Sequence, residues 1–113
     1  MAAAYCPRQG DIVWLSFDPQ AGREQAGHRP ALVLSPERYN RKVGLALFCP
    51  ITTQSKGYPF EVAIPAGAEV SGVVLSDQVK SLDWKARKTR FGCRLPAEAF
   101  QEVVAKLGSL LEK

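Results

Sequence analysis

The chain has 113 residues, of which 46% are hydrophobic and 23% charged, which excludes a disordered chain and suits one globular domain spanning residues 1–113. No apolar run approaches the ~20 residues of a membrane helix, and the N-terminus lacks the basic and apolar regions of a signal peptide, so we expect a soluble, cytoplasmic protein with no membrane partner. The formal net charge of +4 favours an anionic partner.

Short apolar segments separated by Gly and Pro predict a fold that is mainly β. Strands are expected at residues 11–17, 31–35, 45–51, 59–64, 72–79 and 89–94. Short strands at close spacing favour a small barrel or sheet of strongly twisted antiparallel strands.

The end of the chain changes period. Residues 96–111 carry apolar side chains at helical spacing, and Pro96 suits a first helical position. We therefore expect a C-terminal helix that caps the barrel with one apolar stripe, formed by Phe100, Val103, Val104, Leu107 and Leu111.

The connection before the second strand concentrates groups suited to chemistry. It carries Arg23, Glu24, His28 and Arg29 between two glycines and a proline. A residue before proline is pushed out of the helical region, so Arg29 should be extended where the strand begins. Loops that display titratable groups from a rigid scaffold are frequent sites of binding and catalysis. The structural alternative is that Arg29 only pairs with Glu24.

Basic residues gather in two runs, one within residues 80–94 and one formed by Arg38, Arg41 and Lys42. Each run alone is adequately explained as a solvated face. Together, and with Trp84 and Tyr39 interleaved, they favour a polyanionic partner. Aromatic rings beside basic groups suit unpaired bases, on which they can stack.

The cysteines and the histidine offer no convincing metal site. Cys6, Cys49 and Cys93 are odd in number and widely spaced, which argues against a disulfide framework or a structural zinc site. With one histidine and no clustered acidic residues, we expect chemistry without a metal or other cofactor.

Four segments resemble the MazF branch of the MazF/PemK toxins. They are residues 10–14 (GDIVW), 24–30 (EQAGHRP), 51–62 (ITTQSKGYPFEV) and 75–81 (LSDQVKS). The resemblance runs from about Tyr5 into the C-terminal helix. The second and third segments are specific in combination, whereas Gly-x-Arg-Pro alone would be a weak signal.

This resemblance implies an SH3-like barrel with a C-terminal helix, of the CcdB/PemK type, assembled as a homodimer. It further implies a toxin of a toxin–antitoxin pair, a sequence-specific endoribonuclease (mRNA interferase). Such an enzyme cuts single-stranded mRNA without metal and leaves a 2′,3′-cyclic phosphate and a 5′-hydroxyl. The implied partner is a MazE-like antitoxin whose acidic tail blocks the RNA groove.

The resemblance places the catalytic arginine at Arg29 and the catalytic threonine at Thr52. Arg29 offers a permanent charge and forked donors for a phosphate, and Thr52 a hydroxyl donor, although Thr52 could simply bond its own turn. Metal-free cleavage also needs a base. Glu24 is the first candidate and His28, whose intrinsic pKa is near neutrality, the second.

One position departs from the PemK-like branch, where an arginine and an aspartate two residues later transfer the protons. Here Leu75 stands at the arginine position, so Asp77 is interpreted as an RNA-binding or structural residue. Lys56, Gln78 and Lys80 fall within the matching segments and are further candidate RNA contacts.

Two other functions remain open. A gyrase-poisoning toxin of the same fold would resemble the CcdB relatives, but those depend on a C-terminal tryptophan, whereas this chain ends Leu-Leu-Glu-Lys. A non-catalytic nucleic-acid-binding barrel would explain the charge but not the Glu/His/Arg loop. The RNA motif that is cut depends on loop geometry and does not follow from the sequence.

Overall fold

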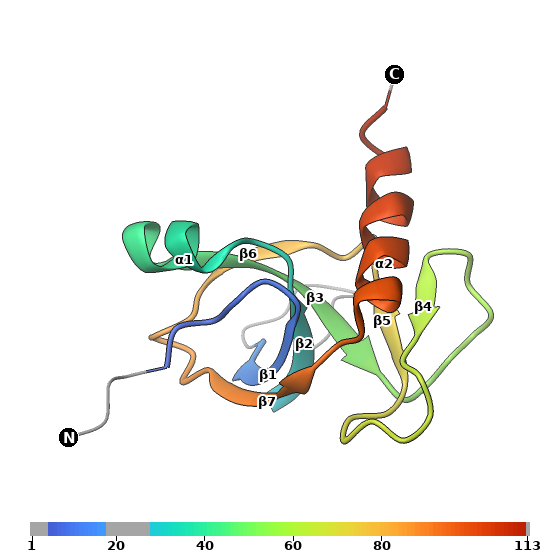
Figure 1. Ribbon diagram of the computed structural model, residues 1–113, viewed down its shortest axis with the longest axis horizontal. Helices are drawn as coiled ribbons and strands as arrows, with labels where there is room; N and C mark the ends of the chain where they lie inside the picture. Colours follow the sequence, from blue (N-terminus) through green and yellow to red (C-terminus); the bar gives the residue numbers. More distant parts are fainter. Residues whose placement is uncertain (1–4, 18–27, 113) are drawn as a thin grey trace.

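The computed structural model describes residues 5–17 and 28–112. Its strands and helices, in chain order, are β1 (Asp11–Ser16), β2 (His28–Val33), α1 (Glu37–Val43), β3 (Leu45–Thr52), β4 (Glu61–Ala63), β5 (Val73–Leu75), β6 (Lys80–Asp83), β7 (Arg90–Arg94) and α2 (Ala97–Ser109). Figure 1 shows α1 at one end of the molecule, and α2 with β4 and β5 at the other.

The described strands form one antiparallel sheet in the order β4-β5-β3-β2-β1-β7, and β6 also pairs with β3. The expected mainly-β fold with a C-terminal helix is confirmed. The sheet curls without closing, because β4 and β7 end the path of described strands and do not pair with each other.

The two faces of the curled sheet carry two core clusters, because side chains alternate along each strand. In β1, Ile12 belongs to one cluster, whereas Val13 and Leu15 belong to the other, and all three are fully buried. The first cluster continues into α2 through Ala99 and Val103. Complete burial of a side chain such as Val103 contributes about 1.5–3 kcal/mol.

The C-terminal helix covers the sheet with part of the expected stripe. Val103 is fully buried, and Phe100 and Leu107 pack against the first cluster. Val104 and Leu111 are instead 43% and 77% exposed, so the expectation that they belong to the capping stripe is wrong. Pro96 is the N-cap rather than the first helical residue, with extended ψ of 145°.

Helix α1 and strand β6 were not expected from the sequence. Fully buried Asn40 anchors α1. Its side-chain amide donates to the backbone carbonyls of Pro7 and Ser35, and its backbone carbonyl accepts a hydrogen bond from the indole N–H of Trp84. Trp84 is therefore a core residue, only 5% exposed, and the expectation that it stacks on bases is wrong.

The edge of the sheet at β4 lies under α2. The ammonium of Lys106 donates to the backbone carbonyl of Glu61 at 2.9 Å. Within the described residues, no helix is both long and apolar enough to cross a membrane.

Candidate functional site

The pairing of three neighbouring strands brings Arg29 and Thr52 to the same end of β2 and β3. Strands β2 and β3 pair with Ala31 facing Pro50, and Arg29 and Thr52 each lie two residues beyond this pair, on the same side of it. Arg29 faces Leu15 of β1. The residue is therefore extended, as expected, but it lies within a strand. The expectations that the strand begins at residue 31 and that Arg29 sits on a loop are wrong, because pairing with β1 extends β2 back to His28.

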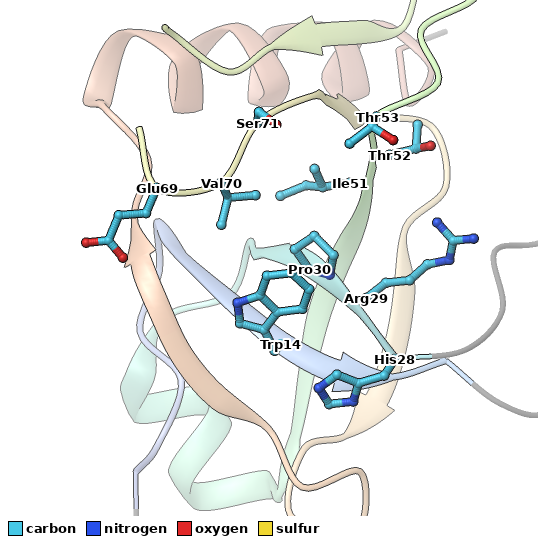
Figure 2. Close-up of a pocket in the computed structure, with 10 residues that line it drawn as sticks. All are labelled: Trp14, His28, Arg29, Pro30, Ile51, Thr52, Thr53, Glu69, Val70 and Ser71. Carbon is cyan, nitrogen blue, oxygen red and sulfur yellow. The ribbon is translucent and has the colours of Figure 1, made fainter. Parts of the chain in front are cut away.

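Two hollows meet at this pair. The smaller, of about 370 Å³, is lined by Arg29 and Thr52 together with Trp14, His28, Pro30, Ile51, Thr53, Glu69, Val70 and Ser71. Figure 2 shows the Arg29 side chain reaching toward the side on which Thr52 and Thr53 lie. The larger hollow, of about 900 Å³, is also lined by Arg29, Thr52 and Thr53, and continues along the segment after β3.

The Thr52 hydroxyl can act on a ligand while it holds its own turn. Its Oγ1 accepts the backbone N–H of Gln54 at 3.1 Å. A hydroxyl that accepts one bond still carries a proton to donate. The turn-bonding alternative and the phosphate-binding role are thus compatible.

Gly72 lies directly against the backbone of Thr52. Its φ is +120°, and a Cβ atom at this position would lie 2.3 Å from the Thr52 carbonyl oxygen. Only glycine adopts such a conformation without strain, so this residue fixes how closely the chain passes the end of β3.

His28 points away from the Arg29 guanidinium and toward Trp14 (Figure 2). Its ring is stacked on the Trp14 indole, with centroids 6.2 Å apart and an interplanar angle of 10°. The structure therefore brings His28 to the smaller hollow but not to the side of Arg29 that faces Thr52. Glu24, the other candidate base, lies outside the described residues.

Three of the four candidate RNA contacts line the larger hollow. Lys56, Asp77 and Gln78 share it with Arg29 and Thr52. Lys80 does not line either hollow; it begins β6 and pairs with Phe48 of β3.

The segment that carries Lys56 is held by Glu61, to which sequence reasoning assigned no role. One Glu61 carboxylate oxygen accepts the Ser55 hydroxyl at 2.7 Å and the other accepts the Lys56 backbone N–H at 2.9 Å. These bonds, that of Ser55 first, lower the pKa of Glu61 below its ordinary value. The carboxylate thus organises the wall of the larger hollow.

Tyr58, on the same segment, was also given no role. The available signal was an aromatic residue directly after the polar run Thr-Thr-Gln-Ser-Lys-Gly. Its side chain is 45% exposed, and its hydroxyl donates to Asp77 Oδ2 at 2.6 Å.

Comparison with known proteins identifies the family of the chain. Residues 8–111 match the family described as PemK-like, MazF-like toxin of type II toxin-antitoxin system. The chain therefore belongs to this toxin family.

In the described part of the chain, no group of three or more His, Cys, Asp or Glu side chains is placed to hold a metal ion.

Individual relatives cover nearly the whole chain. The endoribonuclease toxin MazF of Escherichia coli K12 is 54% identical over 112 residues, 98% of this chain and 99% of that protein. The crystal structure of MazF from Deinococcus radiodurans superposes with a TM-score of 0.93 at 56% identity, covering 96% of this chain and 98% of that one. A MazE-MazF structure from the same organism gives a TM-score of 0.85 at 50% identity, covering 96% and 97%.

Proposed function

We propose that this protein is a sequence-specific, metal-independent endoribonuclease that cuts single-stranded mRNA, and that residues 1–113 act as a single toxin domain. The observation that carries the proposal is the position of Arg29 and Thr52, which both line two adjoining hollows. Relatives of this size and identity are named endoribonucleases.

The reaction is a transesterification in which one P–O bond forms and another breaks. The 2′-hydroxyl gives its proton to a base and its oxygen bonds to the adjacent phosphorus, while the bond from phosphorus to the 5′-oxygen breaks. The 5′-oxygen leaves with a proton from a general acid, which gives a 2′,3′-cyclic phosphate and a 5′-hydroxyl.

Arg29 and Thr52 would act on the phosphate itself. The guanidinium presents several N–H donors in a fixed fork, which suits phosphoryl oxygens on which charge develops. The Thr52 hydroxyl can add one more donor from the facing strand. Guanidinium effectively does not deprotonate in proteins, so Arg29 is not the base.

For the base we propose Glu24 first and His28 second. The placement of His28 against Trp14, away from the guanidinium, supports this ranking. RNA contacts are assigned to Lys56 and Gln78 in the larger hollow, and to Lys80 as an outlying contact. Asp77, in the same hollow, is assigned an RNA-binding or structural role.

We further propose that the protein acts in the cytoplasm as a homodimer, and that a MazE-like antitoxin inhibits it through an acidic tail. Solved relatives include MazE-MazF structures. An acidic tail and RNA are both extended polyanions, so the cations beside the larger hollow suit either.

The test is to incubate the purified protein with a long single-stranded RNA in excess EDTA and to map the ends of the products. Cyclic phosphate on the upstream fragment and 5′-hydroxyl on the downstream one are expected, and Arg29→Ala should yield no product while keeping its fold. A strict need for Mg²⁺, 5′-phosphate ends, or cleavage by Arg29→Ala at the parent rate would contradict the proposal.

A further inference from the structure

Among the described residues, the aromatic side chain that lines the larger hollow is Tyr58. The residue is 45% exposed and belongs to the segment between β3 and β4. A large ring left open to solvent beside the Arg29–Thr52 pair is unused by the chemistry proposed above.

The ring is held in place from two directions. Its hydroxyl donates to Asp77 Oδ2 at 2.6 Å, and the ring lies against the Phe60 ring, with centroids 5.7 Å apart and planes inclined at 51°. The bond to the Asp77 carboxylate raises the pKa of Tyr58, so the hydroxyl keeps the proton that makes this bond. Fixing an aromatic ring before a ligand arrives reduces the ordering needed on binding.

The Asp77 carboxylate has an unused hydrogen-bond acceptor within the part of the chain that the structure describes. The other carboxylate oxygen of Asp77, Oδ1, is buried and makes no hydrogen bond with the described residues, and the same is true of Oε1 of the next residue, Gln78. Among the described residues, the carboxylate of Asp77 is therefore held by its hydrogen bond with Tyr58.

We propose that Tyr58 is a stacking platform for an unpaired base next to the scissile phosphate, and that Asp77 is its positioning residue. This inference rests on the proposed function and adds to it a contact with the base. Every nucleobase has a flat face that stacks on an aromatic ring, so the platform binds a base without reading its edge. Asp77 then acts on RNA through Tyr58, not by direct contact.

The first measurement is binding, made independently of cleavage. An oligonucleotide that spans a mapped cut site, with a 2′-deoxy sugar at the attacking position, cannot be cleaved, and 2-aminopurine replaces the neighbouring base. Binding to the parent protein should quench the 2-aminopurine fluorescence. Tyr58→Ala should abolish the quenching and weaken binding roughly 5- to 150-fold, the range expected for one lost base stack.

The matched control is Tyr39→Ala. Tyr39 is the other aromatic residue that the sequence sets beside a basic run, but it lies on α1, is 40% exposed, and lines neither of the two hollows at Arg29 and Thr52. Its removal should therefore leave the affinity and the quenching unchanged. Thermal unfolding should show that both variants keep the fold, since both side chains are exposed.

A double-mutant cycle separates positioning by Asp77 from direct contact. Tyr58→Phe keeps the ring but loses the bond to Asp77, and Asp77→Ala removes the other partner of the same bond. If Asp77 acts through Tyr58, the double variant should bind no more weakly than the weaker single variant. Additive losses would assign Asp77 a contact of its own and overturn its positioning role.

Three further outcomes would overturn the platform itself. The first is that Tyr58→Ala leaves the quenching unchanged, and the second is that it loses no more affinity than Tyr39→Ala. The third is that Tyr58→Ala binds RNA normally but is no longer inhibited by a peptide rich in Asp and Glu. The last would assign the ring to a protein partner. Parent protein that fails to cleave RNA contradicts the proposed function instead, so the two failures are distinguishable.

Discussion

Gly72→Ala should damage the site through the backbone of Thr52. The substitution has two consequences that can be estimated separately. An L-residue held at φ +120° is strained by about 1–3 kcal/mol. The new Cβ would also lie 2.3 Å from the Thr52 carbonyl oxygen and 2.9 Å from its carbon, and relieving such a contact in a packed region costs about 1–3 kcal/mol more.

The matched control is Gly67→Ala. Gly67 also has a positive φ, +91°, but a Cβ there would meet nothing within 4 Å. Urea denaturation should show the strain alone for Gly67→Ala and about 1–3 kcal/mol of additional destabilisation for Gly72→Ala.

Activity should separate the two variants further. The carbonyl of Thr52 must shift to admit the Cβ, and a displacement near 1 Å at a reacting group costs ~10²-fold in rate. Gly67→Ala should cleave at nearly the parent rate at a temperature where both variants are folded. Folded Gly72→Ala with parent activity would refute the argument that the position of Thr52 limits catalysis.

Three further predictions concern the base, the segment after β3 and the charge. Glu24→Gln should lower the cleavage rate by ~10²–10⁴ with RNA binding much less affected, and a near-normal rate would move the base to His28. The Glu61 carboxylate should titrate, by NMR, below its ordinary value of ~4.3; because the folded pKa is lowered, its stabilisation of the Lys56 segment is complete above that value and is lost as pH falls through the folded pKa. RNA binding should weaken with salt at a slope of roughly −0.7 per neutralised phosphate, whereas an antitoxin tail with apolar anchors should lose less affinity, and simultaneous binding of both in a gel shift would contradict competition.

The strands other than β6 could be predicted because Gly and Pro interrupt segments that are apolar for a physical reason, namely burial on one or both faces. Helix α1 could not be predicted in this way. It has seven residues and one buried side chain, Asn40, so it carries no apolar stripe. The burial of Trp84 could not be predicted for a related reason. Nothing in its basic sequence neighbours indicates that its indole N–H donates to the backbone carbonyl of Asn40.

The candidate site shows the same division. The residue types at Arg29 and Thr52, together with the segments around them, are enough to indicate chemistry on a phosphate. That the two residues come to the same end of neighbouring strands depends on the register of β2 against β3, which is a long-range property. Tyr58 and Glu61 were missed because their roles arise from contacts made within a folded segment, with Asp77 and Ser55 respectively.

The contact between Lys106 and the Glu61 carbonyl has a consequence for how copies of this protein meet in solution. An open sheet ends in strands whose unpaired backbone groups can template another strand and begin aggregation. By donating to a carbonyl of short β4, the ammonium occupies an acceptor that a foreign strand would otherwise use. It also sets a positive charge beside that border. Lys106 thereby discourages sheet-to-sheet joining between molecules of this protein.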